Sequence, residues 1–263
     1  AAGEPGSRLG LTLDWAPPPW TGVRSYSLYL WHWPIADVSQ PGIDTQMTTW
    51  LDKLIRTRKV AQLNRVRQVF LAWNIVGAAV GYGCMIGITN IFMSWIPTYL
   101  VTVKGFTSIK MGFLASAPFL GAVVGNVLGG LVSDRLLGKR RKPLMMLSAF
   151  GTIFTMLALI NAPDNAAYLG FTLFLAGLTV SMGFGGYTVY PMGLANKAVY
   201  PVSFGMINSV GQIGGACAPL AAGMLLDAYS WTSVFVYMGC SALLCLLILL
   251  TIVEPVIEPG GKS

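Results

Sequence analysis

Charge is scarce in this chain. Only 10% of its 263 residues are charged and 54% are hydrophobic, and the mean hydropathy is +0.64. About a quarter of the residues in an ordinary soluble domain carry charge. Such a composition excludes a soluble globular domain, and we predict an integral membrane protein.

Metal-ligating side chains are also few. The chain has one histidine, His32, and its four cysteines lie inside apolar runs without CxxC or Cys/His spacing. Zinc sites need clusters of such ligands. We therefore expect no metal site and no cofactor, and we interpret the cysteines as inert packing residues.

Nucleic-acid binding is excluded despite the net charge of +7. Most Lys and Arg residues fall in two clusters, 53–67 and 135–142, each just outside an apolar run, and no aromatic-rich basic groove accompanies them. Basic loops beside membrane spans mark the cytoplasmic side. This placement predicts an inner-membrane protein with both clusters in the cytoplasm.

Long apolar runs are what the chain does contain. A bilayer core about 30 Å thick requires roughly 20 apolar helical residues. The runs predict six spans, and the first should stop before Pro97. The predicted spans cover residues 69–96, 109–132, 143–160, 167–190, 202–226 and 231–253. The C-terminal tail, 256–263, is then cytoplasmic.

The residues before the first span differ from the rest. Residues 1–47 contain Pro17, Pro18, Pro19 and Pro41, which break helices, so no independent fold is expected there. Residues 48–68 are basic with interleaved apolar positions and predict an amphipathic cytoplasmic linker helix. Because the chain begins without methionine, we expect a fragment or a processed chain.

A glycine, acid and basic string lies between the second and third predicted spans. Gly130 and Asp134 are four residues apart and share a helix face. Glycine admits a neighbouring helix, and the carboxylate can accept bonds from the N-terminal amides of an adjacent helix in one conformational state only. The alternative is an ordinary basic loop. The predicted gating motif is Gly130, Asp134, Arg135, Gly138, Lys139, Arg140 and Arg141.

Candidate ligand-binding side chains inside the spans are all neutral, since no ionisable residue lies in the middle of any span. Such residues either bond neighbouring helices or line a water-filled cavity, and both interpretations remain open at each position. Nearby glycines and prolines favour the cavity interpretation for Asn208, Gln212 and Thr188. We assign Asn126 to a contact between helices. The candidates are Asn208, Gln212, Thr188, Tyr187, Ser181, Tyr82 and Asn90.

The glycine, acid and basic string resembles the loop motif of the major facilitator superfamily. The segments 95–100, 105–108 and 201–223 look like the C-terminal half of anion:cation symporters of organic and sugar acids. The resemblance covers about residues 56–255. It implies an all-α membrane protein whose six helices, within residues 69–255, form the C-terminal six-helix bundle of that fold.

The same resemblance implies a function and a partner. The expected function is transport of a small organic or sugar-acid anion by alternating access. It requires a second six-helix bundle, either a missing N-terminal half or another copy of this chain. The family's charged residues for proton coupling and carboxylate binding lie mainly in the first half, so none is carried over to this sequence.

Two other hypotheses were weighed. Residues 22–36, around His32, resemble a signature of the acyltransferase-3 family. That family's catalytic histidine and arginine lie in a span that this chain lacks, so we expect no enzyme and no catalytic residue. The other hypothesis is a truncated or fused transporter fragment without activity.

Overall fold

The computed structural model describes residues 57–58, 62–137 and 140–255. The chain divides into two units, Ala1–Thr45 and Gln46–Ser263, and every described residue belongs to the second. The predictions for residues 1–47, including His32, and those for Gly138, Lys139 and the tail 256–263 lie outside the described residues.

Six long helices dominate the described structure. They are α4 (Trp73–Thr102), α5 (Ser108–Leu131), α6 (Lys142–Ile160), α7 (Ala166–Met182), α9 (Tyr200–Ala228) and α10 (Trp231–Thr251). A π-helical turn η1 (Val132–Leu136) extends α5, while α8 (Phe184–Val189) and the 3₁₀ turn η2 (Tyr190–Gly193) continue α7. Six segments are long and apolar enough to span a membrane. The prediction of an all-α protein with six spans is confirmed.

The first span extends beyond its predicted end. Helix α4 continues through Pro97 to Thr102, so the following loop is only 103–107. Residues after the proline are well packed: the Tyr99 ring lies 5.2 Å from both Trp231 and Phe235, measured between centroids. This burial keeps the last turns helical although proline removes one backbone bond.

Within the described residues, the predicted linker helix is found only from Val66 onward. Residues Thr57–Arg58 form strand β1, which pairs in parallel with strand β2 (Glu254–Pro255). Leu63 donates its backbone N–H to the Leu194 carbonyl at 2.8 Å, and helix α3 begins only at Val66 (Val66–Leu71). At Thr57–Arg58 and at Leu63, the linker backbone thus bonds to distant segments.

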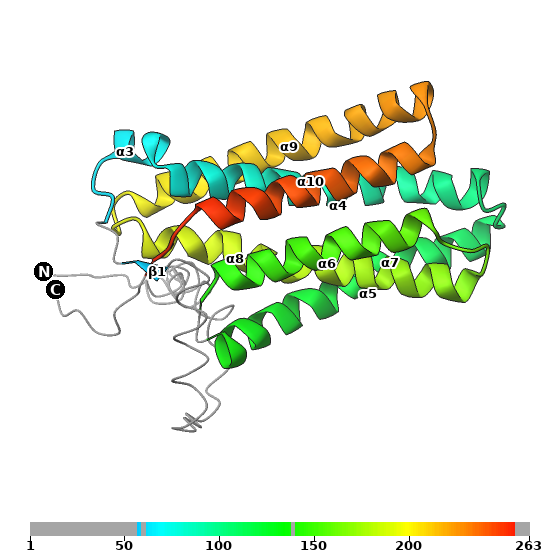
Figure 1. Cartoon of the computed structure of the whole chain (residues 1–263), viewed down its shortest axis with the longest axis horizontal. Helices are drawn as coiled ribbons and strands as arrows, with labels where there is room; N and C mark the ends of the chain where they lie inside the picture. The colour runs from blue at the N-terminus through cyan, green and yellow to red at the C-terminus, as the bar shows by residue number, and fades with distance from the viewer. Residues whose placement is uncertain (1–56, 59–61, 138–139, 256–263) are drawn as a thin grey trace, which may run out of the picture. The chain divides into compact units, whose positions relative to one another are not determined.

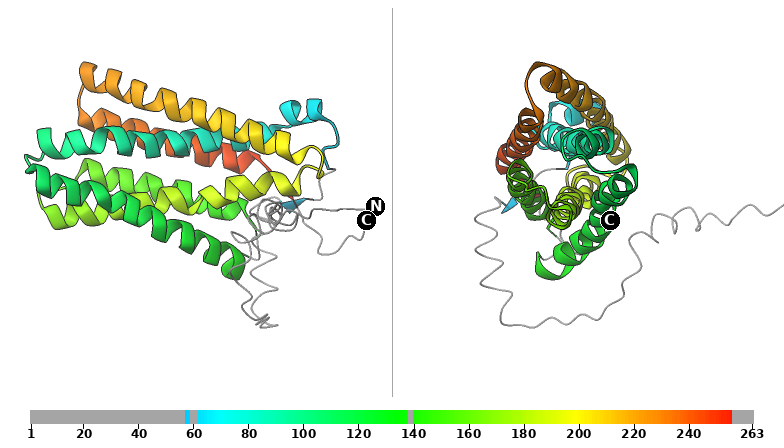
Figure 2. Two further views of the ribbon diagram at one scale, coloured as in Figure 1. Left: turned by 180° about the vertical axis from the view of Figure 1, so that it is seen from behind. Right: turned by 90° about the vertical axis from the view of Figure 1, so that its right-hand side faces the viewer.

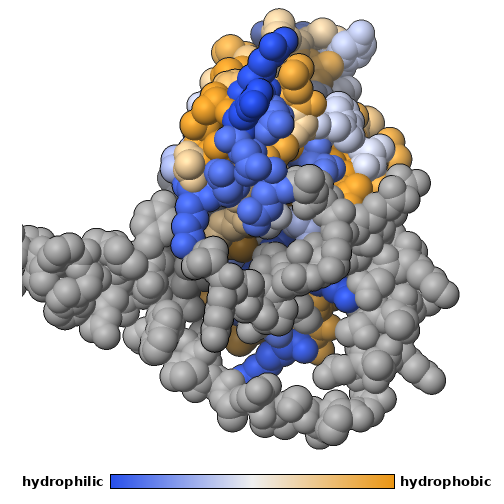
Figure 3. Space-filling view, turned by 90° about the vertical axis from the view of Figure 1, so that its left-hand side faces the viewer, coloured by the Kyte–Doolittle hydropathy of each residue, from blue (hydrophilic) through white to orange (hydrophobic). Residues whose placement is uncertain are grey.

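The long helices run antiparallel, so the loops gather at two ends (Figure 1). One end, the basic end, carries α3, the strands and the described cations Arg65, Arg67, Arg135, Arg140, Arg141, Lys142 and Lys197. Hydrophilic residues are concentrated there (Figure 3). The loops 103–107, 161–165 and 229–230 lie at the other end, the far end. The two views in Figure 2 show the helices side by side as a bundle.

Helices α5 and α7 meet through glycine. Gly121, Gly125 and Gly129 follow one stripe of α5, and a Cβ at any of them would overlap a backbone carbonyl oxygen of α7. A Cβ at Gly177 of α7 would likewise overlap the Pro118 carbonyl oxygen. Small residues drive such close approach in membranes, where lipid gives helices no hydrophobic reason to associate. The two backbones are therefore in direct contact.

Helices α4 and α9 use the same principle. A Cβ at Gly214 would lie 2.8 Å from backbone atoms of Gly83, and a Cβ at Gly87 would lie 2.8 Å from the Ala218 Cβ. The third close pair, α6 with α10, has larger side chains between its helices, including Met156 and Met238, both fully buried. Two glycine-packed pairs joined by one conventional pair make up the bundle.

Adjacent glycines on α5 offer a matched test of this packing. Gly129→Ala should lower the unfolding midpoint in detergent, because overpacking against the α7 backbone costs about 1–3 kcal/mol. Gly130→Ala should raise the midpoint, since its Cβ meets nothing within 4 Å and alanine is favoured over glycine in a helix by up to about 1 kcal/mol. Equal effects of the two variants would contradict this account.

Candidate functional site

An aromatic cluster links α4 to α8. The Tyr82 ring lies 5.2 Å from the Tyr187 ring and 5.9 Å from the Phe184 ring, centroid to centroid. Tyr187 is only 1% exposed and its hydroxyl lies 3.1 Å from Cys245 Sγ. Tyr82 is half-buried and no described residue bonds its hydroxyl. Of the two predicted tyrosines, Tyr82 alone reaches an open face.

The predicted polar residues of α8 and α9 bond mainly within their own helices. Thr188 Oγ1 donates to its own helix at Gly185, and its carbonyl accepts a 3.3 Å bond from the Tyr200 hydroxyl. Asn208 is half-buried, and its Nδ2 donates to the Phe204 carbonyl at 3.1 Å. Gln212 is exposed.

The two other asparagines do not make the contacts that the sequence predicts for them. Asn90 on α4 donates from Nδ2 to the Gly215 carbonyl of α9 at 2.9 Å, so it joins two helices. Asn126, predicted to join helices, is exposed and bonds only to Ala122 of its own helix at 3.0 Å. The prediction for Asn126 is therefore wrong within the described bundle: α7 contacts α5 at the glycine stripe, and Asn126 lies off that stripe.

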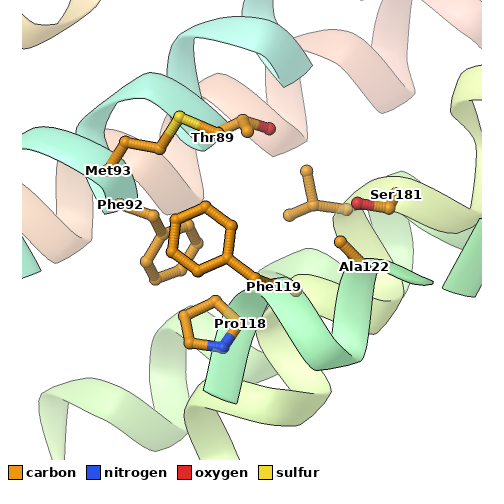
Figure 4. Close-up of a pocket in the computed structure, with 9 residues that line it drawn as sticks. Thr89, Phe92, Met93, Pro118, Phe119, Ala122 and Ser181 are labelled. Carbon is orange, nitrogen blue, oxygen red and sulfur yellow. The ribbon is translucent and has the colours of Figure 1, made fainter. Parts of the chain in front are cut away.

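Ser181 lines a small cavity between α4, α5 and α7 (Figure 4). The cavity has a volume of about 50 Å³, and Thr89 is the only other hydroxyl residue in its wall. Ser181 is 3% exposed, and no described residue bonds its hydroxyl. The remaining wall is apolar, with the rings of Phe92 and Phe119 prominent. This shape suits a water molecule or a small neutral group, and it offers a carboxylate no cation.

The predicted substrate residues thus form separate groups. Tyr82, Asn208, Gln212 and Thr188 lie on or near α4, α8 and α9, whereas Ser181 lies in the α4, α5 and α7 cavity. Asn90 is engaged in a helix contact. The apolar cavity walls were missed because Phe92 and Phe119 are indistinguishable in sequence from lipid-facing residues.

The gating motif is partly folded on itself. In the π-turn η1, Asp134 lies 3.4 Å from Arg141 Nη1 across the loop. Arg141 also donates to Ser133 Oγ at 2.7 Å, and Ser133 donates to the Arg140 carbonyl at 3.2 Å. Arg135 is exposed. These contacts close the loop between α5 and α6.

Two details of the motif differ from the prediction in this conformation. A Cβ at Gly130 would meet no atom of the described residues within 4 Å, and it is Gly129 that admits α7. The carboxylate at a helix N-terminus is Glu254, not Asp134: its two oxygens accept from the backbone N–H groups of Arg141 and Lys142 at 2.9 and 2.8 Å. Asp134 is pulled away from that position by its pairing with the Arg141 side chain.

Glu254 is buried at the start of α6. Its side chain is 4% exposed, and the neighbouring Lys142 is 1% exposed. Burial raises the pKa of the Glu254 carboxyl, and the two amides and Lys142 oppose that rise. A carboxylate at a helix N-terminus meets the positive end of the helix dipole. The sequence signal was a lone acid between Val253 and Pro255, directly after the last span.

The backbone of residues 251–255, the C-terminal strap, is held from several sides. Lys142 Nζ donates to the Ile252 carbonyl at 2.7 Å, and the Tyr190 hydroxyl donates to the Val253 carbonyl at 2.6 Å. The Val253 N–H donates to Asn74 Oδ1 at 3.1 Å. The strap therefore connects α4, α6 and η2 at the basic end.

No group of three or more His, Cys, Asp or Glu residues that could hold a metal ion occurs in the described parts of the chain. In the middle of the described spans, the polar side chains are all neutral. Such a site can recognise a ligand by hydrogen bonds, but it holds no acid and base pair for covalent catalysis.

Six apolar spans, neutral polar side chains within them and a closed basic loop after the second span describe one bundle of a helical membrane transporter. The sequence profile of the Major Facilitator Superfamily matches residues 27–219. The chain belongs to this superfamily, which is one of transporters and not of enzymes. The match reaches into residues 1–47, which the sequence placed outside the transporter half.

Its relatives include sugar-acid transporters. The chain is 29% identical over 199 residues to the probable galactarate/D-glucarate transporter GudP of Escherichia coli K12, covering 72% of this chain and 43% of GudP. It is 30% identical over 198 residues to the probable galactarate/D-glucarate transporter GarP of the same strain, covering 73% and 44%. A D-galactonate transporter of E. coli O6:H1 is 29% identical over 178 residues, covering 65% and 40%. The chain spans less than half the length of these relatives.

The buried carboxyl at the basic end predicts a pH dependence. Because the folded-state pKa of Glu254 is raised above its ordinary value of 4.5, the folded protein binds this proton more tightly than the unfolded chain does. That stability is complete below about 4.5 and is lost as the pH rises through the folded-state pKa. Relative to Glu254→Gln, the wild-type unfolding midpoint should fall as the pH rises above 4.5.

Comparing the two proteins at each pH cancels the titration of every other group. A wild-type midpoint that rises relative to Glu254→Gln over the same range would mean that the α6 amides and Lys142 outweigh burial.

Proposed function

We propose that this chain is one half of a secondary transporter that moves a small organic or sugar-acid anion by alternating access. One observation supports it above the others: within the bundle, only 17% of the apolar window of α5 and 22% of that of α9 are buried, against 67% for α4. Two helices thus present long unpartnered faces. In alternating access, one bundle rocks against another around a central site.

Those faces are large and apolar. On α5 the exposed large side chains include Phe113, Phe119, Leu120, Val123 and Val127, and on α9 they include Ile213, Leu220 and Met224. Lipid covers some of this area. A second six-helix bundle covers the rest, and the length of the relatives, more than twice that of the matched segment, favours a bundle of similar size. It is either an N-terminal half or another copy of this chain.

The proposed substrate class follows from the relatives and from the side chains. GudP, GarP and the D-galactonate transporter are named for polyhydroxylated acids. Hydroxyl groups of such a ligand fit the free polar atoms of Tyr82, Asn208, Gln212 and Thr188. The described spans offer no cation in their middle for a carboxylate, so the second bundle must supply that charge.

The basic end is the proposed gate. The Asp134 and Arg141 pair and the Glu254 bonds to α6 hold the loop and the C-terminal strap closed in this conformation. Gly130, Arg135 and Arg140 complete the described motif, with Gly138 and Lys139 between them in sequence. Breaking these contacts would free α5 to move relative to α6. On the positive-inside rule we infer that the basic end, and with it the C-terminus, faces the cytoplasm at an inner membrane.

A second candidate is a truncated or fused fragment that folds without transporting. The compact packing of α4 with α9 and of α5 with α7 needs no second bundle, which is why folding alone does not separate the two hypotheses. Measurements of transport and of ligand binding separate them.

Uptake of radiolabelled D-glucarate into proteoliposomes tests the proposal. Monomeric and dimeric fractions of the chain, and the chain co-expressed with the first six-helix half of E. coli GudP, are reconstituted separately. Saturable uptake should require two bundles. Asn208→Ala should reduce it about tenfold, the equivalent of one lost hydrogen bond of about 1.4 kcal/mol. Asn161→Ala is the matched control, since Asn161 is exposed at the far end and bonds only within its own helix, and it should change uptake less than twofold.

Uptake by strictly monomeric chain would contradict the need for a second bundle. Absence of uptake in every preparation, together with no calorimetric binding of D-glucarate, would favour the inactive fragment.

A further inference from the structure

Pro219 leaves one carbonyl of α9 without its helical partner. Proline has no backbone N–H, so the bond from residue 219 to the carbonyl four residues earlier, that of Gly215, is absent. An unsatisfied carbonyl inside a bilayer costs several kcal/mol. Asn90 of α4 supplies the missing donor, with Nδ2 at 2.9 Å from the Gly215 oxygen.

The orientation of that amide is determined by its partner. A carbonyl only accepts hydrogen bonds, so the nitrogen end of Asn90 must face Gly215. The contact is also close, since a Cβ at Gly215 would lie 2.7 Å from Asn90 Nδ2. Asn90 therefore occupies the one place from which α4 can complete the interrupted helix.

A second residue of α4 holds the helix just beyond the proline. Trp95 Nε1 donates to the Pro219 carbonyl at 3.0 Å. The Trp95 ring also lies against Gly223, where a Cβ would be 3.0 Å from Cζ2. Residues 220–228 of α9, the far arm, are thus attached to α4 on one side.

On its other side the far arm has room. A groove of about 420 Å³ separates the end of α9 from the start of α10, and it is lined by Leu225, Tyr229, Thr232, Ser233, Val236, Tyr237 and Cys240. Helix α9 packs mainly on α4 and little on α10. The arm therefore has an interrupted helical bond at its base, attachments on one face and open space on the opposite face.

We propose that Asn90 is the positioning residue of a hinge in α9: it holds the Gly215 carbonyl that Pro219 leaves free, and release of this bond lets the far arm tilt into the groove beside α10. The hinge concerns one helix within the bundle and goes beyond the proposed transport function. Its test needs neither a substrate nor a second bundle.

A double-mutant cycle tests the hydrogen bond. Asn90→Ala should lower the unfolding midpoint in detergent by roughly 4 °C, the effect of leaving one carbonyl unsatisfied. Pro219→Ala restores a backbone N–H that can donate to Gly215, so Asn90→Ala should have less than half that effect in the Pro219→Ala background. Asn90→Leu removes the donor and keeps the volume, and it replaces Asn90→Ala if that variant does not fold. Equal effects in both backgrounds would overturn the proposal.

Cys240 reports the motion. It is exposed and lines the groove, whereas Cys245 is buried one turn further along α10. In a Cys217→Ser background, N-ethylmaleimide should alkylate Cys240 at least threefold more slowly in Asn90→Ala than with Asn90 present, because the arm then covers the groove. Adding Pro219→Ala should restore the rate.

Cys245 is the internal control. An unchanged Cys240 rate would overturn the hinge, and so would faster labelling of Cys240 together with labelling of Cys245, since that pattern indicates general loosening of the bundle. Failure of D-glucarate uptake would leave both results unaffected, so this proposal and the transport proposal fail independently.

Discussion

Backbone polar groups that a helix leaves unpaired need partners elsewhere in the protein, most strictly inside hydrocarbon, and several contacts of this bundle meet that need. Asn90 serves the carbonyl that Pro219 exposes, Tyr190 and Lys142 serve the carbonyls that follow the last helix, and Glu254 serves the first amides of α6. Each of these side chains comes from a different segment. Unpaired backbone groups are thereby bonded by side chains from distant parts of the chain. In this way α4 is attached to α9 through Asn90 and to the C-terminal strap through Asn74.

Close backbone approach is the second consequence of the same solvent. Lipid does not drive apolar side chains together, so dispersion between closely packed helices must hold the bundle. The glycine stripes on α5 and on α4 with α9 bring backbones into contact along the spans. Between α9 and α10, which pack little on each other, a groove remains. Rigid and loose helix pairs thus alternate in one bundle, and motion is expected where the contact is loose.

The fold could be predicted from sequence because the decisive signals are local: six apolar runs of membrane length, with cations at one set of turns. The contacts were harder to predict. The stripe of Gly121, Gly125 and Gly129 is visible in the sequence at helical spacing, but its partner helix is not. The gating string was found in the sequence. In the structure, however, Gly129 and not Gly130 contacts α7, and Glu254 and not Asp134 accepts the bonds from the first amides of α6. Spacing along a helix says which residues share a face and nothing about which helix meets that face.

The same limit explains the substrate residues. Each predicted polar side chain can satisfy a backbone group or face a ligand, and the choice depends on where neighbouring helices are interrupted. Asn90 lies opposite a proline break and is engaged by it, whereas Asn208 bonds within its own helix and keeps an acceptor free. A neutral bundle of this kind can orient the hydroxyl groups of a ligand but cannot neutralise its carboxylate. Under the proposed function, the charge that selects an anion would therefore have to come from the proposed second bundle.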